Sequence, residues 1–220
     1  MYIKDFKSFD NLFFDFDGTL CESEGDLKAT WRATFIERGL DLARFEAGYR
    51  TGPPTEANAR SFFPEADDDF IAELCKHYRA KYYTSDYPLT VPYPGIDALL
   101  RRLKERGKRI FIATNKNAVP LGRMLDKFGW NGLFDAVLCR DMLPPGENDK
   151  AYLIRECLRE RGLDPERSAM VGDTELDVRA GHHAGIAAIV VTWGYGSAAK
   201  LEKTESPEYL LSFEDAQNIV

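Results

Sequence analysis

Two acidic residues at the end of an apolar segment are the clearest candidates for chemistry in this sequence. Residues 12–14 (Leu-Phe-Phe) are typical of a short buried strand, and Asp15 and Asp17 follow it, ahead of Gly18. Carboxylates at positions i and i+2 can point to the same side of a sheet, where like charges repel unless a cation lies between them. Hard oxygen ligands suit Mg²⁺. The segment predicts a metal site, and the alternative is an ordinary Asp-Gly turn.

Polar residues also follow three later apolar segments that are predicted as strands. Thr114 follows residues 109–113, Gly172-Asp173 follows residues 168–171, and Thr192 follows residues 186–191. Ligands of parallel α/β sheets bind outside the carboxyl ends of the strands. Asp15, Thr114, Asp173 and Thr192 all stand where apolar strands end, so we expect the site at this edge of the sheet.

The elements that position these residues alternate between strand and helix from about residue 91 onwards. This alternation predicts an α/β fold with a parallel sheet. Residues 1–20 and 91–220 are assigned to the α/β core domain, and residues 21–90, which read as entirely helical, to a small cap domain that could serve as a lid. In the cap, the expected helices are 24–39, 42–49, a short piece ending near 63, and 67–83. In the core, the expected helices are 96–106, 118–128, 149–161 and 176–184, and a further strand is expected at 134–139.

Composition excludes several classes of protein. Apolar residues make up 44% and charged residues 30% of the 220 residues, and the net charge of −7 is dispersed, which argues against a nucleic-acid or anionic-membrane surface. The four cysteines are far apart and read as reduced thiols. No apolar run approaches about 20 residues, and the first residues do not resemble a signal peptide. We expect a cytoplasmic protein, either a monomer or a homodimer.

The motifs together resemble those of the haloacid dehalogenase superfamily, and most closely its phosphoglycolate-phosphatase-like branch. The resemblance spans nearly the whole chain and is carried, in order, by Asp15-Phe16-Asp17-Gly18-Thr19-Leu20, Thr114-Asn115, Lys150 and Gly172-Asp173-Thr174-Glu175-Leu176-Asp177. It implies a Rossmann-like core with a helical cap after the first strand. It also implies Mg²⁺-dependent hydrolysis of a small phosphorylated metabolite, with phosphoglycolate among the candidates.

The resemblance assigns roles to the acidic residues. Asp15 would attack phosphorus and form an aspartyl-phosphate, and Asp17 would act as general acid and then as general base. The family's dehalogenases lack an acid at the second position, so Asp17 favours phosphate esters. For Mg²⁺, the implied ligands are Asp15, the backbone carbonyl of Asp17, Asp173, and Asp177 directly or through water. Asp173 and Asp177 would share a helix face if the helix began early enough.

Three other residues receive roles with open alternatives. Thr114 and Asn115 would contact the phosphate near a helix N-terminus, although a plain helix cap explains them equally. Lys150 would bridge the nucleophile and the phosphoryl oxygens. However, Ala151 follows it where the family usually has proline, and an exposed first-turn lysine is the alternative.

Substrate choice is expected to depend on the cap. Arg50 is the candidate for gripping the far end of the substrate, with an ordinary surface arginine as the alternative. The three histidines have no partner at ligand spacing, so we expect surface or packing roles for them: His77, His182 and His183.

Two other functions fit the same motifs. A phosphomutase would use the same nucleophile but pass the phosphoryl group to a sugar hydroxyl. A catalytically silent regulatory protein would keep the fold, but the four aspartates Asp15, Asp17, Asp173 and Asp177 argue against it because their mutual repulsion would serve no purpose.

Overall fold

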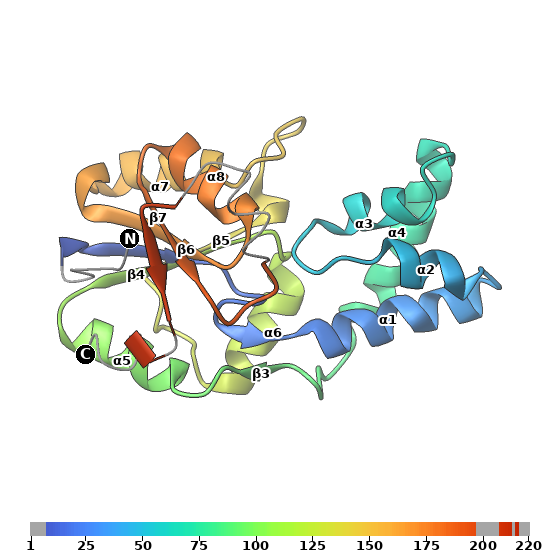
Figure 1. Cartoon of the computed structure of the whole chain (residues 1–220), viewed down its shortest axis with the longest axis horizontal. Coiled ribbons are helices and arrows are strands. Elements are labelled where there is room, and N and C mark those ends of the chain that lie inside the picture. Colours follow the sequence, from blue (N-terminus) through green and yellow to red (C-terminus); the bar gives the residue numbers. More distant parts are fainter. Residues whose placement is uncertain (1–7, 197–206, 213, 216–220) are drawn as a thin grey trace. The chain divides into compact units, whose positions relative to one another are not determined.

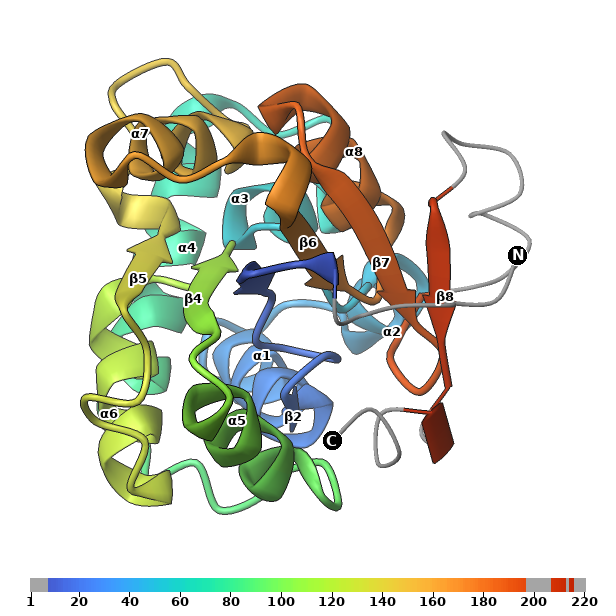
Figure 2. The ribbon, with the colours of Figure 1, turned by 90° about the vertical axis from the view of Figure 1, so that its left-hand side faces the viewer.

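A six-stranded parallel sheet organises the larger part of the molecule. The computed structural model describes residues 8–196, 207–212 and 214–215. Within them the strands run in the order β5-β4-β1-β6-β7-β8 (Figures 1 and 2). Their bounds are β1 Asn11–Phe14, β4 Arg109–Thr114, β5 Ala136–Cys139, β6 Ser168–Gly172, β7 Ala187–Val191 and β8 Tyr209–Leu211. The predicted parallel α/β sheet is confirmed, and β8 is a strand that the sequence did not predict.

Strand β1 lies inside the sheet because three of its four residues, Leu12, Phe13 and Phe14, are apolar and buried. It pairs with β4 on one side and β6 on the other. Leu12 and Phe13 are fully buried, and the Phe13 ring stacks on that of Phe111 with centroids 4.6 Å apart. Burial of one such side chain contributes roughly 1.5–3 kcal/mol to folding. This packing fixes the position at which Asp15 leaves the sheet.

Four helices cover the two faces of the sheet. Helices α7 (Ala151–Arg161) and α8 (Glu175–Ala184) lie on one face, and α5 (Ile96–Glu105) and α6 (Ala118–Phe128) lie on the other (Figures 1 and 2). Short 3-10 turns occupy Arg140–Met142 and Pro165–Arg167. Helix α5 buries a leucine-rich face, which explains its strong sequence signal.

Some predicted boundaries shift in the structure. The helix expected from residue 149 begins at Ala151, because the Asp149 carboxylate accepts a hydrogen bond from the Ala151 N–H at 2.9 Å and so precedes the helix. The strand expected over 134–139 begins at Ala136. The helix expected from 24 to 39 ends at Glu37, and Gly39 follows it with a positive φ of 63°.

The described residues divide into two compact units. One lies within Met1–Glu22 and Pro92–Val220, the core unit, and the other within Ser23–Val91, the helical unit. The helical unit contains α1 (Glu24–Glu37), α2 (Leu42–Gly48), α3 (Thr55–Phe62) and α4 (Asp68–Tyr82). The short strands β2 (Cys21–Glu22) and β3 (Val91–Pro92) pair with each other where the chain passes between the units.

Aromatic side chains form the interior of the helical unit. The Trp31 ring stacks on Tyr78 with centroids 4.2 Å apart and meets Phe62 edge-on at 5.0 Å. Phe35 meets Phe62 edge-on at 5.2 Å. Rings bury large areas, so a small helical unit can hold together around them. No helix within the described residues is both long and apolar enough to cross a membrane.

Candidate active site

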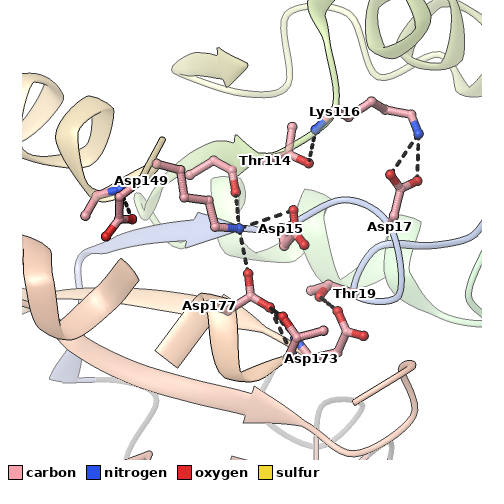
Figure 3. Close-up of polar contacts among 12 residues, drawn as sticks. Asp15, Asp17, Thr19, Thr114, Lys116, Asp149, Asp173 and Asp177 are labelled. Carbon is pink, nitrogen blue, oxygen red and sulfur yellow. Dashed lines mark hydrogen bonds and ion pairs between the residues drawn. The ribbon is translucent and has the colours of Figure 1, made fainter. Parts of the chain in front are cut away.

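The carboxyl ends of β1, β4 and β6 bring the predicted polar residues together. Phe14 of β1 pairs with Ile112 of β4 and Val171 of β6, so the residues that follow these pairs meet at one edge. Asp15, Thr114 and Asp173 lie at this edge (Figure 3). The expectation drawn from the strand ends is confirmed for these three residues. Thr192 follows β7 and is exposed.

Asp15 is a buried carboxylate whose oxygens are incompletely satisfied. Its backbone N–H donates to the Val171 carbonyl at 2.8 Å. Its Oδ1 atom is buried and accepts no hydrogen bond, and the Nζ atom of Lys150 lies 3.4 Å away at ion-pair distance. Burial raises the pKa of Asp15 to about 6, against the opposing charge of Lys150.

Lys150 lies inside the site. Its side chain is 3% exposed, so the alternative of an exposed first-turn lysine is wrong. The ammonium donates to Asp177 Oδ1 at 2.5 Å and to the Ala113 carbonyl at 3.0 Å. Burial opposes its charge, but Asp15 and Asp177 outweigh that effect and raise the pKa of Lys150 above its usual range. The lysine is therefore a fixed cation between two carboxylates.

Asp173 and Asp177 do not share a helix face, because α8 begins only at Glu175. Thr174 is the N-cap, and Asp177 folds back over the first turn. The Asp177 Oδ2 atom accepts hydrogen bonds from the Asp173 N–H at 3.1 Å, the Thr174 N–H at 2.8 Å and the Thr174 hydroxyl at 2.7 Å (Figure 3). Asp177 thus shapes the loop that presents Asp173.

Three of these carboxylates fit a divalent cation. Ligand atoms of Asp15, Asp173 and Asp177 all lie within 4.8 Å of one another, and all three residues are buried. Burial, reinforced by Asp177 and Asp15, raises the pKa of Asp173 to about 8. Buried acids at such spacing ionise readily only when a cation compensates them, and an all-oxygen donor set suits Mg²⁺. The Oδ1 atom of Asp15, which accepts no hydrogen bond, is a suitable ligand atom.

The Asp17 side chain points to a different cation. Both of its oxygens accept hydrogen bonds from the Nζ atom of Lys116, each at 2.8 Å (Figure 3). The Lys116 side chain is 2% exposed, and its N–H donates to the Thr114 hydroxyl at 3.2 Å. The Asp17 side chain is therefore engaged with Lys116 and is not part of the cluster of three carboxylates.

Sequence comparisons identify the family of this chain. Residues 12–191 match the family described as haloacid dehalogenase-like hydrolase. The chain belongs to this family. Phosphoglycolate phosphatase of Pseudomonas putida is 31% identical over 90% of this chain and 74% of that protein, and the protein of the same name from Cereibacter sphaeroides is 33% identical over 84% and 86%. The predicted membership of the haloacid dehalogenase superfamily is confirmed.

A solved structure of the same family shares the fold. The haloacid dehalogenase-like hydrolase SP0104 of Streptococcus pneumoniae superposes with a TM-score of 0.80 over 96% of this chain and 97% of that one, at 28% identity. The similarity extends over both units of the chain. The Rossmann-like core and the helical insertion thus both have counterparts in this haloacid dehalogenase-like hydrolase.

The histidines lie outside the acidic cluster of this haloacid dehalogenase-like site. His182 pairs with Glu208 at 3.0 Å and His183 with Asp149 at 2.7 Å, while His77 contacts Arg38 and Glu73 in the helical unit. These contacts agree with the surface and packing roles expected for them. Arg50 is exposed in the helical unit, and its guanidinium donates to the carbonyls of Ala47 and Tyr49.

Sequence reasoning missed two residues of the site. The Thr19 hydroxyl donates to Asp173 Oδ1 at 3.0 Å, and Lys116 holds Asp17. Both lie inside or directly after motifs that the sequence identified. A lysine two residues past a strand-end threonine could have been considered, but nothing in the sequence indicates that its side chain is buried.

The raised carboxyl pKa values predict how stability changes with pH and how a bound Mg²⁺ would alter that change. An acid with a raised pKa in the folded state keeps its proton where the unfolded chain releases it. Stability therefore falls as pH rises from about 4 through about 6 for Asp15 and about 8 for Asp173. A Mg²⁺ ion at this cluster would require the ionised acids and would therefore reverse this loss. We expect saturating MgCl₂ to raise Tm more at about pH 8 than at about pH 5, relative to chelator.

This expectation is checked by thermal unfolding of the full chain at both pH values, with MgCl₂ or with chelator. The exposed variant Asp41→Asn, which alters a helix cap in the helical unit, serves as a control and should keep the same Mg²⁺ response. An equal rise in Tm at the two pH values would contradict the assignment of Asp15 and Asp173 as ligands.

Proposed function

We propose that this chain is a Mg²⁺-dependent phosphatase that hydrolyses a small phosphomonoester of the phosphoglycolate type through an aspartyl-phosphate. Its family and the relatives named phosphoglycolate phosphatase support a phosphoric monoester hydrolase. The observation that carries the proposal is Asp15, a buried carboxylate at the end of the central strand, whose Oδ1 atom accepts no hydrogen bond and lies at ion-pair distance from Lys150. Such a group is a poor structural element and a suitable nucleophile.

In the first half-reaction an Asp15 oxygen attacks phosphorus. The bond between phosphorus and the ester oxygen breaks, and the leaving alkoxide takes a proton from Asp17. Thr114, the Asn115 N–H and Lys150 bind the phosphoryl oxygens. These preorganised donors stabilise the negative charge on the oxygens in the transition state. Lys150 is suited to this because its ammonium is already held beside Asp15.

In the second half-reaction Asp17 removes a proton from water. The resulting hydroxide attacks phosphorus, the acyl-phosphate bond breaks, and inorganic phosphate leaves while the Asp15 carboxylate is restored. Mg²⁺ held by Asp15, Asp173, Asp177 and the Asp17 carbonyl would supply positive charge to the phosphoryl oxygens. Asp17 thus acts as a general acid in the first half-reaction and as a general base in the second.

The helical unit is proposed to act as a cap and to set the substrate. Fold and catalytic residues do not define a substrate, so this part rests on the names of the relatives and on the chemistry of a second anionic group. Arg50 is proposed to bind the carboxylate of a phosphoglycolate-like ester, since a guanidinium can bind a carboxylate through two N–H groups.

We also propose that the protein acts in the cytoplasm on a free metabolite, as a monomer or homodimer. Its four cysteines are buried free thiols, which suits a reducing compartment. The dispersed net charge of −7 gives no support to a nucleic-acid partner.

Phosphate release from a substrate panel tests this function. The panel contains 2-phosphoglycolate, p-nitrophenyl phosphate, hexose phosphates and other small esters, each with MgCl₂ or with chelator. We expect Mg²⁺-dependent release of phosphate, with the highest kcat/KM for a small carboxylated ester.

Each other outcome of the panel overturns the proposal. Conversion of a hexose 1-phosphate to an isomer without net phosphate release would identify a phosphomutase. Absence of turnover with Mg²⁺ across the panel, in a protein that binds the ion, would identify a silent member of the family. The exposed variant Asp164→Asn should match the parent chain, because Asp164 only caps a 3-10 turn at the opposite edge of the sheet.

A further inference from the structure

The orientation of the Asp173 carboxylate depends on two donors from outside its own strand. The Thr19 hydroxyl donates to Oδ1 at 3.0 Å, and the Tyr195 N–H donates to Oδ2 at 2.7 Å. A carboxylate with one donor on each oxygen cannot rotate without breaking a hydrogen bond. The position of the Tyr195 backbone therefore decides where Asp173 points.

The segment after β7 lies against Asp173 so closely that only glycine fits on either side of Tyr195. A Cβ on Gly194 would lie 2.2 Å from the Asp173 Cβ, and a Cβ on Gly196 would lie 1.7 Å from the Asp173 carbonyl oxygen. The Trp193 indole N–H donates to the Thr19 carbonyl at 3.1 Å. This segment has little freedom of its own, so what holds the Tyr195 side chain bears directly on Asp173.

Glu22 holds the Tyr195 side chain. The Tyr195 hydroxyl donates to Glu22 Oε1 at 2.9 Å, and the Tyr93 hydroxyl donates to Oε2 at 3.2 Å. Glu22 ends β2 and Tyr93 directly follows β3, so one carboxylate joins the two segments by which the chain leaves and re-enters the core unit. Hydrogen bonds to an ionised carboxylate are stronger than neutral ones. Burial and the nearby Glu22 charge raise the pKa of Tyr93, so its hydroxyl remains a donor.

We infer that Glu22 is a positioning residue for the Mg²⁺ ligand Asp173 and acts on it through Tyr195. The inference rests on the metal site of the proposed function and extends it to a residue outside the acidic cluster. Outer partners of metal ligands commonly change metal affinity by 10- to 100-fold when they are altered. The contact also ties metal affinity to the segments that lead into and out of the helical unit.

The test measures Mg²⁺ binding without substrate. The full chain and the variants Glu22→Gln and Tyr195→Phe are titrated with MgCl₂, and Kd is taken from the rise in Tm with Mg²⁺ concentration. We expect each variant to bind Mg²⁺ about 10-fold more weakly than the parent chain. The double variant should be no weaker than the weaker single variant, because both changes remove the same contact.

Asp10→Asn is the matched control. Asp10 also pairs with two donors, Lys108 and Arg167, but lies just before β1, at the opposite edge of the sheet from Asp15. The Arg167 hydrogen bond lowers the pKa of Asp10 to about 2, so its loss reduces stability. Asp10→Asn should lower the free energy of unfolding while the Kd for Mg²⁺ stays within about twofold, as expected for independent sites.

The outcomes separate this inference from the proposed function. Parent-like Kd values in both Glu22→Gln and Tyr195→Phe, with Mg²⁺ binding in the parent chain, would overturn the positioning role alone. Equal weakening in Asp10→Asn would also overturn it, because the effect would then follow general loss of stability. A parent chain that binds no Mg²⁺ would overturn the metal site and this role together.

Discussion

Replacing Asp15 with asparagine is expected to abolish phosphate release, with a loss on the order of 10⁴-fold or more in kcat. The amide oxygen is too weak a nucleophile to form the acyl-phosphate, and other groups already hold two neighbouring carboxylates. Asp17 is bound by Lys116, and Asp177 is bound by Lys150 and the Thr174 loop. The measurement is phosphate release from p-nitrophenyl phosphate, whose good leaving group places little demand on Asp17.

Stability distinguishes loss of the nucleophile from misfolding. Burial raises the pKa of Asp15 to about 6. Above about pH 6 the folded protein therefore holds this carboxylate in its ionised form at a cost in stability. A neutral amide of the same shape avoids this cost, and Asp15→Asn should be at least as stable as the parent chain at about pH 8 in chelator. The partly exposed control Glu156→Gln on α7, which pairs with Arg159 on the same helix, should keep parent activity. Retention of activity in a well-folded Asp15→Asn would remove the basis of the aspartyl-phosphate mechanism.

The sequence predicts the catalytic edge because the relevant information is local. Runs such as residues 109–113 are apolar enough to read as buried strands, and a polar residue must follow where each strand reaches solvent or a ligand. Parallel sheets align their carboxyl ends, so Asp15, Thr114 and Asp173 could be grouped without knowledge of any side-chain contact. The division into core and helical segments follows from the same change of pattern.

Side-chain contacts, most of them between residues far apart in the sequence, determine the parts of the site that the sequence could not predict. The capping of α8 by Thr174 excludes Asp173 from the helix, so the i, i+4 arithmetic with Asp177 did not describe the real arrangement. The burial of Lys116 depends on Asp17, which lies 99 residues away. Lys150 likewise takes its orientation from Asp177 and the Ala113 carbonyl. Pairings of this kind form only when the sheet is assembled and brings distant residues together.

The loss of Lys150 is expected to lower both activity and stability, and the stability effect should depend on pH. Lys150→Met removes the cation between Asp15 and Asp177, and a buried charge that loses its partner costs about 3–5 kcal/mol. At about pH 5 Asp15 can take up a proton, since its pKa is already raised, so the loss should be smaller there than at about pH 8. Phosphate release should fall on the order of 10³-fold, as for loss of an electrostatic stabiliser.

Urea unfolding in chelator at the two pH values measures this effect. The double variant Lys150→Met/Asp177→Asn should recover part of the stability at about pH 8, because it removes one of the two charges left unpaired, while activity stays low. Lys104→Met is the matched control, since Lys104 pairs with the partly exposed Asp135 and its loss should cost no more than about 1 kcal/mol at either pH. Equal destabilisation of Lys150→Met at both pH values would contradict the expected relief by protonation of Asp15, because methionine keeps the apolar stem of Lys150 and removes only the ammonium between Asp15 and Asp177.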